Sequence, residues 1–206
     1  MSLHRLTADQ LQSLREVHSF GAAQAAAALA QLLGEAVSLP RSQVTVIDIA
    51  RLPARLGGGG PVSAGIALHL LGDARGAVLL LLTPESVGKL LGRRLGHADM
   101  LLDELGSSTL KEMGNILACS YFNTLGGRMG LTLRPSVPQL SCGAVEAVIA
   151  PLVSRESRCE EGALLAEAEF HTLREEAGAI RARFLFLPAA ISVHHFLQAL
   201  GRAEKK

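Results

Sequence analysis

The chain has 206 residues, of which 49% are hydrophobic and 19% are charged, and its formal net charge at pH 7 is +1. This near-neutral balance, with 3% aromatic residues, argues against a nucleic-acid partner held by bulk charge or base stacking. No apolar run reaches the roughly 18–20 residues that span a bilayer, and the N-terminus lacks the apolar core of a signal peptide. We therefore expect a soluble, cytoplasmic protein with no membrane partner.

The three cysteines, Cys119, Cys142 and Cys159, have no closely paired spacing. An odd number of widely spaced cysteines is typical of reduced thiols in a cytosolic protein. The C-x-x-C and H-E-x-x-H patterns of common metal sites do not occur in the sequence. We expect the chain to hold neither a metal nor a cofactor of its own.

The first predicted element is a long helix at residues 7–36, in which Thr7 and Gln10 have the spacing of a capping box. Four glycines at 57–60 predict a surface loop. A phosphate-binding loop is the alternative there, but no Lys-Ser/Thr pair or helix start follows it. The other elements expected in this half are a strand at 42–52, a hairpin of strands 62–72 and 76–83 turning at "GDARG", and a short helix at 84–96.

The second half is predicted to repeat this order of elements. Its expected elements are a helix at 103–126, an extended stretch at about 131–149, strands at 163–173 and 180–187 joined by "REEAG", and a helix from Pro188, followed by a frayed "EKK" tail.

Matching residues recur 96 positions apart, as Glu16 with Glu112 and Gly34 with Gly130. This spacing indicates an internal duplication with a repeat too long for a solenoid. We predict an α/β fold in which two αββα-type halves share one sheet and two long helices pack on one face. The chain would then be one domain over 1–206, with pseudo-repeats at about 7–96 and 103–201.

The helix at 103–126 has two distinct faces. At 100° per residue one stripe holds Ser108, Glu112, Asn115 and Cys119, and the other, predicted to face the core, holds Leu110, Met113, Leu117 and Tyr121. Gly114 lies beside the first stripe, where the missing Cβ would let another surface approach closely. The alternative is an ordinary solvent-exposed face with a packing glycine.

The residues Ser108, Glu112, Asn115 and Pro138 reproduce, at full spacing, a motif of the CheC/CheX/FliY family of chemotaxis phosphatases. The chain resembles this family along essentially its whole length, including the duplicated halves that each begin with a helix. The resemblance implies hydrolysis of the aspartyl phosphate of a CheY-like response regulator. It also implies that Mg²⁺ is supplied by the regulator and not by this chain.

The chemistry of an acyl phosphate suits these residues, because the reaction needs mainly a positioned water and a prepared electrostatic environment. We expect Asn115 to position the attacking water, since an amide can accept a hydrogen bond from water and donate one to a phosphoryl oxygen at the same time. Glu112 would repel phosphate directly, so we expect it to pair with a lysine of the regulator. Ser108 is expected to be a peripheral polar contact, and Pro138 a structural residue behind the site.

The first helix carries an incomplete version of the motif at Gln12, Glu16 and Ser19. Ser19 stands where the family has asparagine, His18 where it has glycine, and Ser42 where the spacing would place proline. The first set keeps its acid and loses its amide, so we predict that it is inactive. We expect His18 to lie at the surface.

A different class of function stays open at the level of sequence. The chain could be a non-catalytic partner of a response-regulator domain, or of a CheD-type deamidase, as some members of the family are. A degenerate first set is consistent with a face used for binding.

Overall fold

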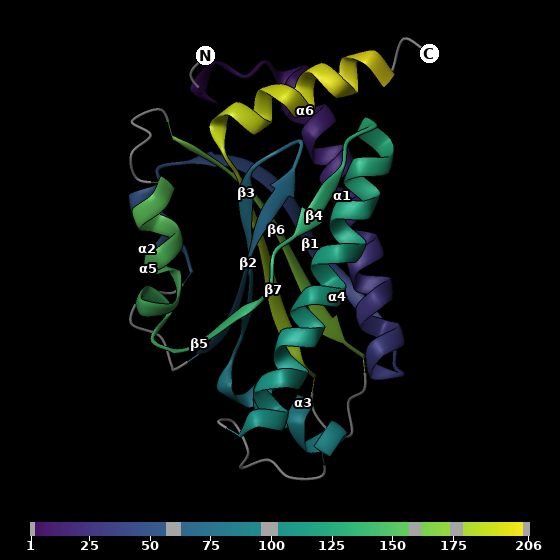
Figure 1. Ribbon diagram of the computed structural model, residues 1–206, viewed down its shortest axis with the longest axis vertical. Helices are drawn as coiled ribbons and strands as arrows, with labels where there is room; N and C mark the ends of the chain where they lie inside the picture. The colour runs from purple at the N-terminus through teal and green to yellow at the C-terminus, as the bar shows by residue number, and fades with distance from the viewer. Residues whose placement is uncertain (1–2, 57–62, 96–102, 157–161, 174–178, 204–206) are drawn as a thin grey trace.

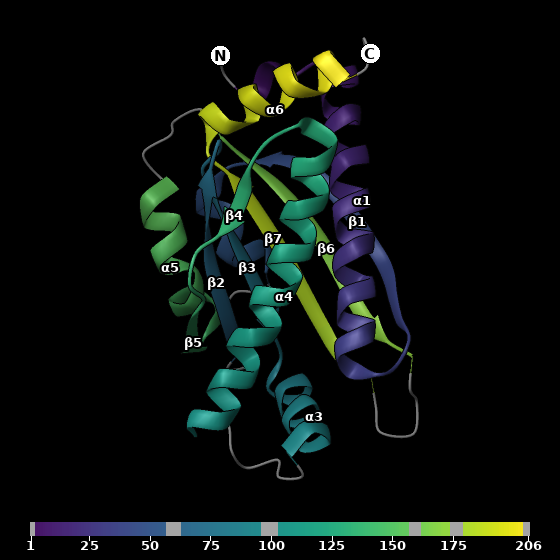
Figure 2. The same ribbon diagram turned by 45° about the vertical axis from the view of Figure 1, so that its right-hand side comes forward.

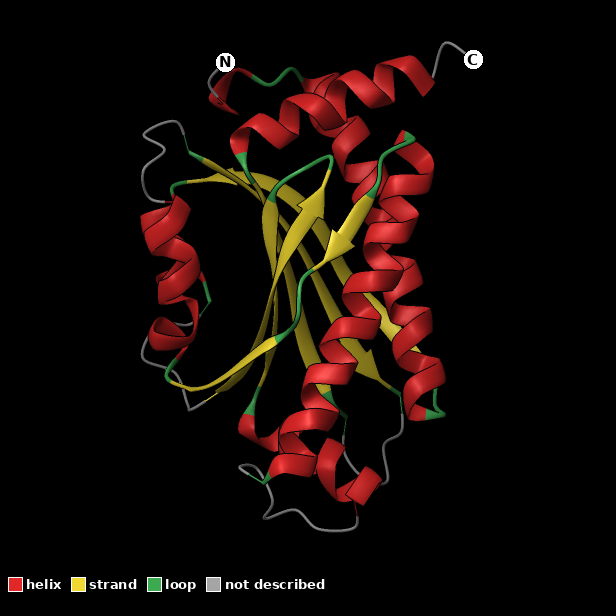
Figure 3. Ribbon diagram, in the orientation of Figure 1, coloured by secondary structure: helices red, strands yellow, loops and turns green. Residues whose placement is uncertain are grey.

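The computed structural model describes residues 3–56, 63–95, 103–156, 162–173 and 179–203. Within them, seven strands form one antiparallel sheet with helices on both faces (Figures 1 and 3). The mixed α/β class and the two long helices on one face are therefore as predicted. The glycines at 57–60, the "REEAG" turn, Cys159 and the "EKK" tail lie outside the described residues.

The two long helices are α1 (Ala8–Leu33) and α4 (Glu104–Met129), each 26 residues long, and they lie side by side (Figure 2). The predicted capping box of α1 is confirmed: the Thr7 side chain accepts from the Gln10 amide at 3.2 Å, and the Gln10 side chain accepts from the Thr7 amide at 3.0 Å. Asp103 caps α4 in a similar way, accepting from the amide of its third helical residue. These bonds satisfy backbone donors that a helix start leaves unpaired.

Both long helices end at a glycine in the left-handed region, Gly34 at φ 68° and Gly130 at φ 65°. A residue with a Cβ would be strained in this conformation, so the two glycines fix where the helices stop. The first helix consequently ends three residues before its predicted limit at 36, and the second ends three residues after its predicted limit at 126.

The sheet has the order β1-β6-β7-β3-β2-β4, with β5 also paired to β2. Its hairpins, β2–β3 and β6–β7, are the two predicted from the sequence. The strands are β1 (Val37–Ile47), β2 (Ser63–Gly72), β3 (Gly76–Leu82), β4 (Leu133–Pro135), β5 (Gln139–Gly143), β6 (Ala163–Thr172) and β7 (Arg181–Pro188).

Two predicted segments were partly wrong. The strand expected at 42–52 begins and ends five residues earlier, and the chain then enters a 3-10 turn, η2 (Ile49–Arg51), and α2 (Leu52–Arg55). The stretch expected to be extended through 149 becomes helical at α5 (Val145–Glu156). Val145, Val148 and Ile149 are all buried and have helical spacing. The prolines that precede them favoured an extended segment, so the start of the helix was not predicted.

The helices divide between the two faces of the sheet. One face carries α1, α4, α3 (Pro84–Leu95) and α6 (Ala190–Ala203) over the larger core, and η1 (Leu3–Arg5) adds Leu3 to it. The other face carries η2, α2 and α5 over a smaller core, at the left of Figure 1. Among the described residues, no helix is both long and apolar enough to cross a membrane.

The sheet order is symmetric about the β7–β3 pair. Each half supplies a long helix, an edge segment, a hairpin and a following helix, and the edge segment of each half pairs with the hairpin of the other. Each half thus has strands beyond the αββα pattern: β1 in the first, and β4 and β5 in the second. The symmetric order agrees with an internal duplication, which itself stays a prediction.

Candidate functional site

The outward side of α4 presents the residues that the sequence pattern placed there. Ser108 and Glu112 are exposed, and Asn115 and Cys119 are partly exposed. We call these four residues the α4 stripe. The opposite stripe is buried as predicted, with Leu110, Met113, Leu117 and Tyr121 each at most 2% exposed. The helix therefore holds a carboxylate and an amide three residues apart, facing away from the main core.

The role expected for Gly114 was wrong. Gly114 is buried, and a Cβ added to it would lie 2.5 Å from Cγ2 of Ile66 in β2. The surface that approaches this glycine is the protein's own sheet and not a partner. Gly114 thus seats α4 on β2, and it supports the α4 stripe from behind.

Asn115 has a neighbour in the next turn of the helix. The Cys119 thiol donates to Asn115 Oδ1, with 3.7 Å between sulfur and oxygen. Burial raises the pKa of the Cys119 thiol, and the negative charge of Glu112 raises it further, so the thiol stays protonated at neutral pH. An amide oxygen has two lone pairs, so Oδ1 can still accept one more hydrogen bond.

Pro138 lies in the short linker between β4 and β5, which is fixed to β2. The Ser136 amide donates to the His69 carbonyl at 2.8 Å, and the His69 amide donates to Ser136 Oγ at 2.9 Å. Just after Pro138, Leu140 pairs with Ile66, the residue that contacts Gly114. The chain that follows Pro138 is therefore paired with the part of β2 on which α4 packs, and the structural role of Pro138 stays a prediction.

A pocket of about 220 Å³ opens next to Glu112. Sequence patterns could not predict this pocket, because its walls come from three elements far apart along the chain. Its walls include Leu32 and Leu33 at the end of α1, Leu90 of α3, and Ser108, Glu112 and Met113 of α4.

The counterpart residues on α1 are also at the surface. Gln12, Glu16 and Ser19 are exposed, and the Gln12 amide donates to Glu16 Oε1 at 2.9 Å. Ser19 Oγ lies 3.3 Å from Ser42 Oγ in β1, within hydrogen-bond distance. Ser19 and Ser42 are 23 residues apart, the same spacing as Asn115 and Pro138, and in this half that spacing brings α1 and β1 together. The Ser19 hydroxyl, which stands at the amide position of the motif, therefore already has Ser42 as a hydrogen-bond partner.

His18 is buried, so the expectation that it lies at the surface was wrong. It is 2% exposed and joins α1 to both α4 and β6: Nδ1 lies 2.9 Å from the Tyr121 hydroxyl, and Nε2 lies 3.1 Å from the Glu167 carbonyl. A carbonyl can only accept, so Nε2 carries the proton and Nδ1 accepts from Tyr121. Burial lowers the pKa of His18 to about 4, so the ring is neutral at pH 7.

The described residues contain no group of three or more histidine, cysteine, aspartate or glutamate side chains that could hold a metal ion. The α4 stripe itself offers an amide, a carboxylate, a hydroxyl and a thiol. Such groups can bind, orient and exchange hydrogen bonds with a water and a partner's charged groups.

Comparison with known proteins gives a consistent set of similarities. No family model matches the chain. The "CheY-P phosphatase CheC" of Bacillus subtilis is 29% identical over 198 residues, covering 94% of each chain. FliY of Thermotoga maritima has a similar structure, with a TM-score of 0.71 and 17% identity over 97% of this chain and 99% of that one.

A second similar structure includes a partner. It is the complex of CheX with CheY, BeF₃ and Mg²⁺ from Borrelia burgdorferi, at a TM-score of 0.55 and 13% identity over 84% of this chain and 96% of that one. At this identity the similarity concerns the fold alone.

Proposed function

We propose that this chain, which is 29% identical to the CheC of Bacillus subtilis over 94% of each chain, is a phosphatase of the CheC/CheX/FliY family that hydrolyses the aspartyl phosphate of a CheY-like response regulator. One observation carries the proposal: α4 presents the carboxylate of Glu112 and the amide of Asn115 together on its outward side. The Bacillus subtilis relative is named for the same activity, and the CheX of similar fold is seen bound to CheY.

In this proposal Asn115 positions the attacking water. The Cys119 thiol donates to one lone pair of Asn115 Oδ1. The second lone pair would accept a hydrogen bond from the water, and the amide nitrogen of the same side chain would donate to a phosphoryl oxygen. The glutamine of small GTPases performs the same kind of task. The acyl phosphate is already reactive, so a fixed water supplies most of what hydrolysis needs.

Glu112 is proposed to dock the regulator. Its negative charge would repel a phosphoryl group, whereas a lysine of the regulator near that group would attract it. The ion pair would orient α4 and bring Asn115 into line. Ser108 would add a peripheral polar contact, and Mg²⁺ would be held by the regulator.

Replacing Glu112 with alanine is expected to raise KM for the phosphorylated regulator by about tenfold and to lower kcat as well, since both docking and alignment are lost. Steady-state phosphate release at varied regulator concentration measures both constants. An unchanged KM would show that Glu112 is not part of the docking surface. Glu16→Ala, which removes the same charge from the counterpart position, is the matched control.

The first set on α1 is proposed to be inactive, because Ser19 offers a hydroxyl that is already engaged with Ser42. The variants Glu16→Ala and Ser19→Ala are each expected to keep the wild-type rate within about twofold, a range typical of surface residues outside a site. The same phosphate-release assay measures this. A large loss in either variant would mean that the first helix takes part in the reaction.

One assay separates a phosphatase from a binding protein. Receiver domains phosphorylated with acetyl phosphate are mixed with the protein, and phosphate release is followed with and without it. Faster release supports the proposal. Tight binding of a receiver domain with unchanged release would make the chain a non-catalytic partner instead.

A further inference from the structure

The pocket next to Glu112 has a composition that points to one kind of occupant. Leu32, Leu33, Leu90 and Met113 make most of its wall apolar, and Glu112 supplies a carboxylate at the end where the α4 stripe begins. Leu90 and Met113 are each 2% exposed, so the floor is formed by the core itself. A lysine side chain matches this arrangement, since its methylene stem covers apolar surface while its charged end stays near water or a carboxylate.

We propose that this pocket receives the lysine of the docking regulator, with the stem against Leu32 and the ammonium paired with Glu112. The inference rests on the proposed function, and it names a recognition element that the motif does not contain. Two observations support a regulator as the source of the occupant. The carboxylate complements a basic side chain, and the pocket is continuous with the α4 stripe, because Ser108 and Glu112 belong to both.

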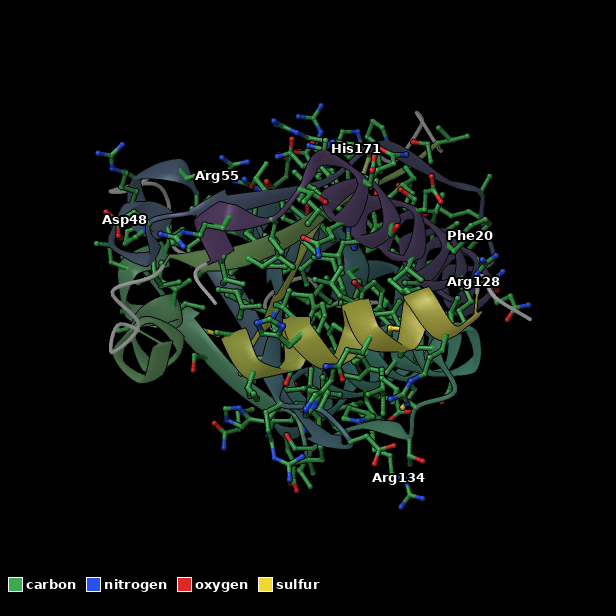
Figure 4. All side chains as sticks on the ribbon, turned by 90° about the horizontal axis from the view of Figure 1, so that it is seen from above. Phe20, Asp48, Arg55, Arg128, Arg134 and His171 are labelled. Atoms are coloured by element: carbon green, nitrogen blue, oxygen red, sulfur yellow. The ribbon has the colours of Figure 1, made fainter. Side chains whose placement is uncertain are left out.

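By the predicted 96-residue repeat, the corresponding place in the other half of the protein is basic. The residue 96 positions after Leu32 is Arg128, at the end of α4. Its guanidinium carbon lies 3.4 Å from the centre of the Phe20 ring on α1, and both side chains are exposed (Figure 4). The counterpart of Leu32 is therefore a cation stacked on an aromatic ring, a favourable pairing.

Arg128 would act against docking at the first set. Its fixed positive charge would repel an incoming lysine, and its stem would cover the surface that the lysine would need. The two halves thus differ at the amide position, and they differ again at the position that admits the partner. Position 32 in one half and position 128 in the other are inferred to determine which helix docks.

The variant Leu32→Arg gives the pocket beside Glu112 the residue type that the chain has at the corresponding position 128. Leu32 is partly exposed, so an arginine there can direct its charge to water without being buried. With a receiver domain that the wild-type protein dephosphorylates, we expect KM to rise by about tenfold or more while kcat stays within about twofold. Gln31→Arg is the matched control, because it adds the same charge at an exposed neighbour that does not line the pocket.

The outcomes are distinct. An unchanged KM for Leu32→Arg, with wild-type activity present, would overturn this inference and leave the phosphatase proposal standing. An equal rise for Gln31→Arg would also overturn it, since general repulsion would then explain the effect. A change in self-association by sedimentation velocity, with KM unchanged, would make the pocket an interface between copies. If the wild-type protein accelerates no receiver domain, both proposals fail together.

Discussion

Replacing Asn115 with alanine is expected to lower the stimulated rate of regulator dephosphorylation by about 10²-fold or more, equivalent to roughly 3 kcal/mol of transition-state stabilisation. The loss should appear in kcat, because the amide is proposed to hold the attacking water and not the partner. Asn115 is partly exposed and only its Oδ1 is engaged, by the Cys119 thiol at 3.7 Å, so truncation should leave the fold intact. Single-turnover decay of a phosphorylated receiver domain measures the chemical step directly.

The same helix provides a matched control for this experiment. Asn123 is an exposed asparagine two turns further along α4 and outside the stripe, so Asn123→Ala should keep full activity. Asn115→Asp tests the amide itself, since a carboxylate of the same size cannot donate to a phosphoryl oxygen and adds a repelling charge. Asn115→Asp should therefore be as inactive as Asn115→Ala. Full stimulation by Asn115→Ala would show that the proposed mechanism is wrong.

Replacing Gly114 with alanine is expected to lower the free energy of unfolding, although alanine is the better helix former. The added Cβ would lie 2.5 Å from Ile66 Cγ2 and 3.1 Å from its Cβ, inside the contact distance of real carbon atoms. Overpacking a core costs about 1–3 kcal/mol, whereas exchanging glycine for alanine in a helix returns at most about 1 kcal/mol. The net loss should therefore be up to about 2 kcal/mol, measured by urea unfolding.

Gly127 is the control for Gly114, because it lies on the same helix and is exposed, with no atom within 4 Å of the place where its Cβ would be. Gly127→Ala should therefore raise the free energy of unfolding by about 0.5–1 kcal/mol. Equal stabilisation by the two substitutions would contradict the conclusion that Gly114 is there to seat α4 on β2.

The long helices and hairpins could be predicted because their signals are local. A capping residue, a helical apolar period and a closing glycine define α1 and α4, and alternation around a turn defines each hairpin. The start of α5 could not be read in this way. Its three buried apolar residues follow a proline-rich stretch. Three residues span too few turns to distinguish a helical period from an irregular segment.

The candidate site was predictable only as far as one helix determines it. The period of α4 correctly places Glu112 and Asn115 outside and Leu117 inside. The period does not say what lies across from each residue, so it left open which surface approaches Gly114, and the structure places Ile66 of β2 there. His18 was misplaced for the same reason, because its partners Tyr121 and Glu167 are more than 100 residues away.

The most direct test of the central claim is the rate of phosphate release from receiver domains phosphorylated with acetyl phosphate, compared for wild-type protein, Asn115→Ala and no protein. We expect clear acceleration of at least one receiver domain by the wild type. For Asn115→Ala we expect a rate close to that without protein. Acceleration that survives the loss of Asn115, or no acceleration of any receiver domain by the wild type, would contradict it.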